Sequence, residues 1–484
     1  MRALEGLKPE KVFYFFEEIC QIPHGTYNTK QISDYCKHFA EERGLRVLQD
    51  SANNIIIWKP GSAGYENCEP VILQGHIDMV CEKTIDSTHD FATDPLELYV
   101  EDGFVKARNT TLGGDDGIGV AMALAILDSD SICHPPLEVV LTSEEESGMD
   151  GALALDMSPL KGKRLINIDS EEEGFLTVGC AGGCRFDTTL SVDREEQKGL
   201  VLEIGISGLL GGHSGIEIYR QRGNGHKLMG RLLYKISESV NLRLISVGGG
   251  SKDNVISREC TAHIMISENM EQKCMEIGEQ MLQVWKNEFG SDEPELSLEI
   301  KNEGVSAESV FTETSTKQVI TYLFGMPDGI MCYSRNLPGQ VETSLNAGSV
   351  TTNENTVIIA HLIRSEIDTK KWAVVKQLSA LAELAGGTGK PRSSYPAWSY
   401  RKDSNLRSVM VSVYREFYGK EPEILTIHGG LECGLFLGKK PELDCVSFGP
   451  DVIDVHSVTE RLDIASVERS YEYLLKVLEA CRLV

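Results

Sequence analysis

An apolar segment of the chain ends in a histidine and an aspartate placed two positions apart. The run Val71–Gln74 leads through a glycine to His76 and Asp78. In an extended strand, residues i and i+2 point to the same face. His76 could therefore bind a metal ion through one ring nitrogen, while Asp78 accepts the other ring N–H or otherwise holds the imidazole in place. The alternative is an ordinary surface turn, which accounts for a lone His-x-Asp pair without any ligand.

Carboxylates follow two further segments of this kind. Asp115 and Asp116 stand where a glycine-rich loop breaks into an alanine-rich, apolar helix. A single aspartate there could simply cap the helix and interact with its dipole. Glu144, Glu145 and Glu146 directly follow a β-branched segment, and three like charges destabilise a site unless cations neutralise them. A solvated acidic loop is the alternative for these three residues.

The same pattern occurs twice more. The apolar segment 164–168 ends in Asp169, and a late loop carries Asp454, His456 and Ser457 just ahead of the last predicted helix. Each of these positions follows an apolar segment or precedes a helix. Their recurrence favours one shared metal site over several unrelated turns.

In order and context, these segments resemble the di-zinc peptidase family that includes carboxypeptidase G and the aminoacylases. Five further segments resemble the aminoacyl-histidine dipeptidase branch of that family, and the resemblance extends over essentially the whole chain. They are 180–183, 211–215, 223–228, 342–346 and 430–434. The set is specific, although no single segment would be.

The resemblance implies a site with two divalent metal ions that activate one water molecule. Asp115 would bridge the ions, His76 and Asp169 would complete one ligand shell, and Glu146 and His456 would complete the other. This oxygen and nitrogen set without thiolate suits Zn²⁺, with Mn²⁺ or Co²⁺ as alternatives. The peptide bond after Asp115 is expected to be cis.

The resemblance also implies roles for residues that are not ligands. Glu145 would act as the general base, and Asp78 would orient the first ligand histidine. His213, in a Gly-Gly-His-Ser-Gly loop, would donate to the oxyanion. In relatives such a histidine can come from the second subunit, which implies a homodimer. A turn histidine is the alternative for His213.

Three more residues are candidates for binding the substrate. Arg364 follows a predicted strand, and a guanidinium can bind a terminal carboxylate through two hydrogen bonds. An arginine at a strand end is often only solvated, so that alternative stays open. Asn224 and Asn346 are expected to assist.

The function implied is that of a metal-dependent dipeptidase acting on Xaa-His or a broader range of dipeptides. The first alternative is an N-acyl amino acid deacylase with the same di-metal site. The second is a metal-binding or scaffold protein without catalysis, which the presence of Glu145 and Asp78 disfavours.

Composition excludes some partners. A net charge of −26 over 484 residues would repel nucleic acid and anionic membranes. The 13 cysteines fit buried thiols in a reducing compartment better than a disulfide framework, and Cys180 and Cys184 are expected in the core. No segment is long and apolar enough to span a membrane, and the first residues lack the apolar core of a secretion signal. We therefore expect a cytoplasmic protein.

The predicted elements indicate an α/β catalytic domain, a mixed sheet covered by helices, with an inserted α+β lid domain. The catalytic domain is expected at 1–185 and 398–484, and a dimerising, substrate-closing lid at 186–397, because His456 follows the α+β block while its partners precede it. Helices are expected at 11–22, 29–43, 223–237, 405–417 and 463–483. Strands are expected at 45–48, 54–58, 71–74, 137–142, 165–168, 185–192, 201–207, 357–363 and 423–427.

Overall fold

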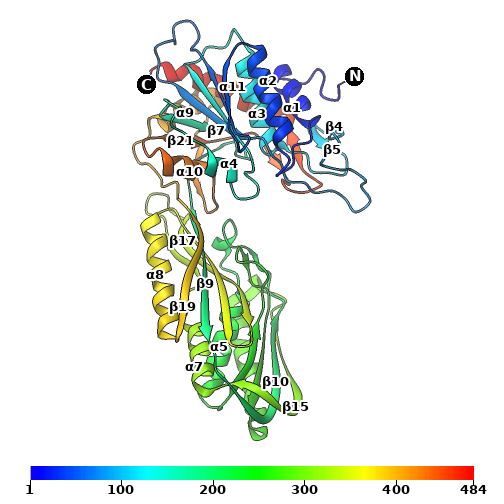
Figure 1. Cartoon of the computed structure of the whole chain (residues 1–484), viewed down its shortest axis with the longest axis vertical. Coiled ribbons are helices and arrows are strands. Elements are labelled where there is room, and N and C mark those ends of the chain that lie inside the picture. Colours follow the sequence, from blue (N-terminus) through cyan, green and yellow to red (C-terminus); the bar gives the residue numbers. More distant parts are fainter. Residues whose placement is uncertain (1, 484) are drawn as a thin grey trace. The chain divides into compact units, whose positions relative to one another are not determined.

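The structure is a computed structural model, and it describes residues 2–483. The chain divides into two compact units (Figure 1). Unit 1 comprises the residues up to Cys180, Tyr400–Thr426 and the residues from Leu431 onward. Unit 2 comprises Ala181–Ser399 and Ile427–Gly430.

Unit 1 is built on an eight-stranded mixed sheet of strand order β1-β2-β6-β3-β7-β21-β8-β20. Its strands are β1 Arg46–Gln49, β2 Ile55–Lys59, β3 Val71–His76, β6 Leu137–Thr142, β7 Arg164–Asn167, β8 Phe175–Cys180, β20 Glu423–Ile427 and β21 Asp444–Ser447. The neighbours β6, β3, β7 and β21 run parallel. Both β3 and β6 are buried along their whole length, as expected for parallel strands covered on two faces.

Helices and a second, small sheet complete unit 1. Helix α1 packs on α3, α3 packs on β3, and α9 packs on α11 (Figure 1). The helices are α1 Glu10–Cys20, α2 Lys30–Glu42, α3 Gly114–Asp128, α4 Asp150–Ala154, α9 Asn405–Tyr418, α10 Glu432–Lys439 and α11 Ile464–Ala480, followed by a 3₁₀ turn at Cys481–Leu483. The small sheet joins β4 Leu98–Glu101, β5 Phe104–Ala107, β22 Val452–Ile453 and β23 Arg461–Asp463. The predicted α/β class is confirmed.

Unit 2 contains three sheets. Their orders are β12-β14-β10-β15, β16-β17-β18-β9-β19 and the pair β11-β13. The strands are β9 Gly182–Ser191, β10 Arg194–Ser207, β11 Gly212–His213, β12 Arg243–Gly248, β13 Val255–Ile256, β14 Cys260–Ile266, β15 Ser297–Phe311, β16 Gly329–Tyr333, β17 Val341–Thr352, β18 Thr356–Ser365 and β19 Gly387–Tyr395.

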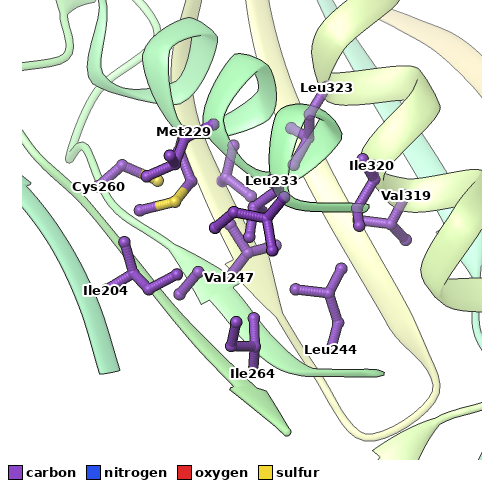
Figure 2. Packing of buried hydrophobic residues seen from close by; sticks show 14 of the residues in the cluster. Ile204, Met229, Leu233, Leu244, Val247, Cys260, Ile264, Val319, Ile320 and Leu323 are labelled. Atoms are coloured by element: carbon purple, nitrogen blue, oxygen red, sulfur yellow. The ribbon is translucent and has the colours of Figure 1, made fainter. Parts of the chain in front are cut away.

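The helices of unit 2 cover its two larger sheets. They are α5 Gly225–Ser237, α6 Glu271–Phe289, α7 Glu313–Gly325 and α8 Asp368–Leu384, with 3₁₀ turns at Ile218–Arg220, Glu268–Met270 and Gly290–Asp292. Helix α8 packs on β9, β18 and β19, while α5 lies between α7 and the four-stranded sheet. Figure 2 shows Leu233 of α5 between Val319 of α7 and Ile264 of β14. This apolar cluster is the main core of unit 2.

Several element boundaries differ from the predicted ones. Strand β10 begins at Arg194, seven residues before the expected start, because its polar first half pairs along β15 and shows no apolar alternation. Residues 427–430, expected in the catalytic domain, belong to unit 2. There Ala181 donates a backbone hydrogen bond to Ile427, and His428 bonds to Ser344.

The cysteines and the helices bear on two further expectations. Within residues 2–483 no disulfide joins any of the cysteines, and Cys180 and Cys184 are buried as predicted. None of the helices described in this range is both long and apolar enough to cross a membrane.

The core of unit 2 gives a stability prediction. Leu233 is fully buried, so Leu233→Ala should lower the free energy of unfolding by about 2–5 kcal/mol through lost burial and a cavity. Urea unfolding measures the loss of free energy, and hydrogen exchange of peptides from unit 2 shows that the loss lies in this unit. Leu384→Ala is the matched control, because Leu384 is 84% exposed and its replacement should leave the free energy of unfolding within about 0.5 kcal/mol of wild type. Equal midpoints for both variants would contradict the core assignment.

Candidate active site

Three parallel strands deliver the acidic and histidine residues to one edge of the large sheet. Strand β3 ends at His76, β6 ends just before the glutamates at 144–146, and β7 ends just before Asp169. Because β6, β3 and β7 are parallel neighbours, their carboxyl ends meet at the same edge, where α/β proteins usually place their sites.

The Asp115 carboxylate lies between the two histidines. Its Oδ1 is 2.9 Å from Nε2 of His76, and its Oδ2 is 3.2 Å from Nε2 of His456. Asp169 Oδ1 lies 3.4 Å from the same nitrogen of His76, and Glu146 Oε1 lies 2.9 Å from that of His456. The two oxygens of Asp115 thus face two separate groups of donors.

These donor atoms fit two metal ions. His76, Asp115 and Asp169 form one group whose donor atoms lie within 4.8 Å of one another, and Asp115, Glu146 and His456 form a second. Ligand atoms about 2.1 Å from one tetrahedral Zn²⁺ are roughly 3.4 Å apart, close to the separations observed. The predicted ligand set is therefore brought together, with Asp115 shared by both groups.

The electrostatics of the cluster favour cations. Burial, followed by the charges of Asp169, Glu432 and Glu146, raises the pKa of Glu145 well above its usual range. Burial, with the nearby Asp115 charge, raises the pKa of Asp169 to about 6. Hydrogen bonds to Asp115 and Glu146 raise the pKa of His456 to about 11. The raised pKa values mean that protons neutralise negative charge that divalent cations would neutralise if they were bound.

Asp78 contacts His76 mainly through its main chain. Nδ1 of His76 lies 3.0 Å from the backbone carbonyl of Asp78 and 3.5 Å from its carboxylate. The carboxylate accepts backbone N–H bonds from Glu145 and Glu146 and the hydroxyl proton of Thr26. Asp78 therefore orients the imidazole mainly through its main chain, while its side chain fixes the glutamate loop.

His213 of β11 lies in unit 2, where its ring tautomer is defined. The backbone N–H groups of Gly215 and Ile216 donate to Nδ1, so the neutral ring carries its proton on Nε2. Burial and the charge of Arg364 lower the pKa of His213, which keeps the ring neutral. An Nε2–H donor is what an oxyanion requires.

The other predicted residues of unit 2 are buried. Arg364 is only 6% exposed and lies inside β18, so the alternative of a solvated arginine is wrong. Asn224 caps α5 by accepting from the N–H of His226. Asn346 donates to the carbonyls of Asp253 and Val255. The two asparagines thus hold backbone in place, and a contact with substrate stays a prediction for them.

Comparisons with known proteins agree with this geometry. Residues 72–480 match the model of peptidase family M20/M25/M40. The chain belongs to this family. It is 40% identical over 481 residues, 99% of each chain, to the cytosol non-specific dipeptidase of Escherichia coli (strain K12). The crystal structure of aminoacylhistidine dipeptidase from Vibrio alginolyticus matches with a TM-score of 0.92 at 39% identity, over 99% of this chain and 98% of that one.

A more distant structure shows only the fold of the family. Aminopeptidase PepT from Bacillus cereus matches with a TM-score of 0.57 at 15% identity, covering 98% of this chain and 99% of that one. The M20 match spans the segments that carry every candidate ligand. The cis peptide bond expected between Asp115 and Asp116 is also present.

Three carboxylates that support the M20 site were not predicted from the sequence. Glu460 accepts the backbone N–H groups of residues 112–114 and so holds the loop before Asp115. Glu432 accepts from the side chains of Gln74 and Thr142. Asp116 accepts the backbone N–H of the candidate ligand His76. Glu432 lies in segment 430–434, one of the segments that carry the family resemblance, whereas no local sequence pattern indicates a role for Glu460.

The side chain of Asp116 lies so close to the backbone at Gly75 and Gly119 that only glycine fits at these two positions. A Cβ at Gly75 would lie 2.2 Å from one Asp116 oxygen, and a Cβ at Gly119 would lie 2.3 Å from the other. Both separations are far below contact distance. The space that the Asp116 carboxylate occupies thus explains the glycine before His76 and the glycine three positions after Asp116.

A buried aspartate beside Asn224 gives a pH prediction. Asp328 accepts from Asn224 Nδ2 at 3.3 Å and from the N–H of Ala347 at 2.8 Å. Burial raises its pKa to about 7, above the unfolded value of about 3.9. The folded state therefore binds more protons between about pH 4 and 7, and stability falls as pH rises through that window.

Replacing this carboxyl group should remove the effect. In wild type, Asp328 should make the free energy of unfolding fall between about pH 5 and 7, by at most roughly 1.4 kcal/mol per pH unit. In Asp328→Asn this fall should be smaller. Denaturant unfolding at several pH values measures it. The exposed Asp292, changed to Asn, is the control. Identical slopes in wild type and Asp328→Asn would contradict the raised pKa.

Proposed function

We propose that this chain is a metal-dependent dipeptidase that hydrolyses the amide bond of dipeptides, including those of the Xaa-His type. The observation that carries the proposal is the pair of donor groups sharing Asp115, in a chain similar over 99% of its length to a dipeptidase. The printed name of the Vibrio alginolyticus relative supports histidine as the second residue. The E. coli name, cytosol non-specific dipeptidase, supports a broader range and a cytoplasmic location.

Two divalent cations, with Zn²⁺ as the proposed metal, would activate the attacking water and polarise the scissile carbonyl. His76 and Asp169 would hold one cation, and Glu146 and His456 the other, with Asp115 shared. The neutral and anionic donors, without any thiolate, support Zn²⁺ but also suit Mn²⁺ or Co²⁺.

Glu145 is the proposed general base. Its side chain belongs to a donor group with His76 and Glu146, yet it is not needed in either group around Asp115. Asp78 fixes its backbone N–H, which restrains the carboxylate. Glu145 would take the proton of the water and return it to the leaving amine.

Unit 2 supplies the proposed residues for the rest of the substrate. His213 would donate its Nε2–H to the oxyanion, and Arg364 would bind the terminal carboxylate. Asn224 and Asn346 are proposed to assist by holding the backbone around them. We also propose a homodimer in which the partner chain provides this histidine, and a substrate-closing role for unit 2.

An assay panel tests the reaction class. Purified, metal-loaded protein should hydrolyse dipeptides such as β-alanyl-histidine, Gly-His and Leu-Gly, and the product amine should appear only when metal is bound. An N-acetyl amino acid in the same panel separates the deacylase alternative, since that enzyme needs no free N-terminal amine. Turnover of the N-acetyl compound alone would overturn the dipeptidase proposal.

The base assignment predicts a loss of kcat without loss of metal. Glu145→Gln should bind both metals by elemental analysis, while kcat falls by at least about a hundredfold. Glu172→Gln is a matched control, because Glu172 is exposed and outside the donor groups. A metal-loaded Glu145→Gln enzyme with full activity would exclude Glu145 as the base.

The two unit 2 residues should affect different kinetic constants. Arg364→Ala should mainly raise KM for substrates with a free carboxylate, because that contact exists already in the bound substrate. His213→Ala should mainly lower kcat, because its contact forms as the oxyanion develops. A pure KM effect for His213→Ala would contradict the oxyanion role.

Subunit mixing tests whether His213 acts on the partner chain. Inactive His213→Ala and inactive Glu145→Gln chains should regain some activity in heterodimers, since one site would then contain both wild-type residues. Demonstrated heterodimers without any activity would exclude the arrangement across two chains.

A further inference from the structure

Arg364 carries a buried positive charge that unit 2 does not neutralise. The residue is 6% exposed, and its Nε has no hydrogen-bond partner. Among the residues described in unit 2, its side chain forms a hydrogen bond only to the hydroxyl of Tyr395, at 3.1 Å, and no ion pair. A buried charge without a counter-ion is costly, so this guanidinium fits a site that receives an anion.

Tyr395 reaches Arg364 across a glycine. In the five-stranded sheet, Gly183 of β9 pairs with Arg364 of β18 on one side and with Tyr395 of β19 on the other. Figure 1 labels the neighbouring strands β9 and β19. A Cβ at Gly183 would lie 2.4 Å from Cζ of the Tyr395 ring. The missing side chain therefore leaves the space in which the phenol ring lies.

Tyr395, Gly183 and Arg364 thus form a row across the strands, and this row continues on the other side of Arg364. Ser344 of β17 pairs with Arg364, and its hydroxyl lies 2.7 Å from Nε2 of His428. Burial, followed by the charge of Arg364, lowers the pKa of His428 to about 3, so His428 is neutral. The row thus carries a single positive charge flanked by neutral hydrogen-bonding groups.

The loop of His213 adjoins this row within unit 2. A Cβ at Gly215 would come within 2.5 Å of the carbonyl oxygen of His428 and 2.9 Å of Cε1 of His213. The proposed oxyanion donor and the row are therefore neighbours in one unit.

We infer that Tyr395 is a positioning residue in a subsite for a single carboxylate. Through the space left by Gly183, Tyr395 reaches Arg364 and orients it toward the C-terminal carboxylate of the dipeptide. The inference rests on the proposed function and extends it to selection of a free carboxylate. Tyr395 accepts from the guanidinium and can donate its own proton onward. One guanidinium with neutral neighbours suits one carboxylate, and it discriminates against a C-terminal amide, which has no negative charge.

The discrimination between acid and amide tests this inference. Wild type, Tyr395→Phe and Arg364→Ala are compared on Gly-His and on its C-terminal amide. Tyr395→Phe should raise KM for the free acid about three- to tenfold, because the guanidinium loses the one hydrogen bond that orients it, with kcat within about twofold. Its kcat/KM for the amide should not change. Tyr333→Phe is the matched control, because Tyr333 is exposed at the end of strand β16 in the same sheet.

A binding measurement without turnover separates this inference from the proposed function. Inhibition or calorimetric binding of L-histidine should weaken in Tyr395→Phe, while that of histidinamide should not. Gly183→Ala, which displaces the phenol ring, should reproduce the Tyr395→Phe pattern. If wild type hydrolyses dipeptides but Tyr395→Phe loses acid and amide turnover equally, or neither, the positioning role is wrong. If wild type hydrolyses no dipeptide, the proposed function fails first.

Discussion

The crowding of carboxylates around Asp115 is the constraint on which unit 1 depends. Asp115, Glu146 and Asp169 lie with two imidazoles in a space where the donor atoms are about one ligand spacing apart. Burial alone would force several of these groups to take up or keep protons. A fold that holds them ionised needs cations between them and backbone donors behind them. The first requirement explains the metal chemistry, and the second explains much of the surrounding chain.

Backbone donors supply the second requirement at three places. Asp78 takes the N–H groups of the glutamate loop, Glu460 takes those of the loop before Asp115, and Asp116 takes that of His76. Each of these supporting carboxylates fixes main chain next to a candidate ligand. Supporting residues of this kind determine the geometry of a metal site as much as the ligands do.

Unit 2 follows a different rule, because its functional candidates carry little charge. His213 is held neutral with a defined tautomer, and Arg364 is the one charge of its row, beside Tyr395, Ser344 and His428. Strand register rather than charge neutralisation places these groups. A single glycine in the row allows the aromatic ring to reach the arginine, so the arrangement depends on a missing side chain.

The sequence by itself determined the strand ends and the residue types that follow them. Apolar runs identified β3, β6 and β7, and the histidine or carboxylates after each run predicted the candidate ligands, because parallel strands bring their carboxyl ends to one edge. The insertion was visible because His456 follows the α+β block. Together with the resemblance, these local patterns were enough for the family and for naming the candidate ligands.

Only the tertiary structure decided which groups support the site and how they are oriented. Glu460 contacts a loop almost 350 positions earlier in the chain, and no local pattern reports such a pairing. The row of Tyr395, Gly183, Arg364 and Ser344 arises from the register of four strands that are distant in sequence. The assignment of residues 427–430 to unit 2 likewise depends on long-range hydrogen bonds. Sequence patterns encode burial and local conformation, whereas contacts between distant segments exist only once the chain has folded.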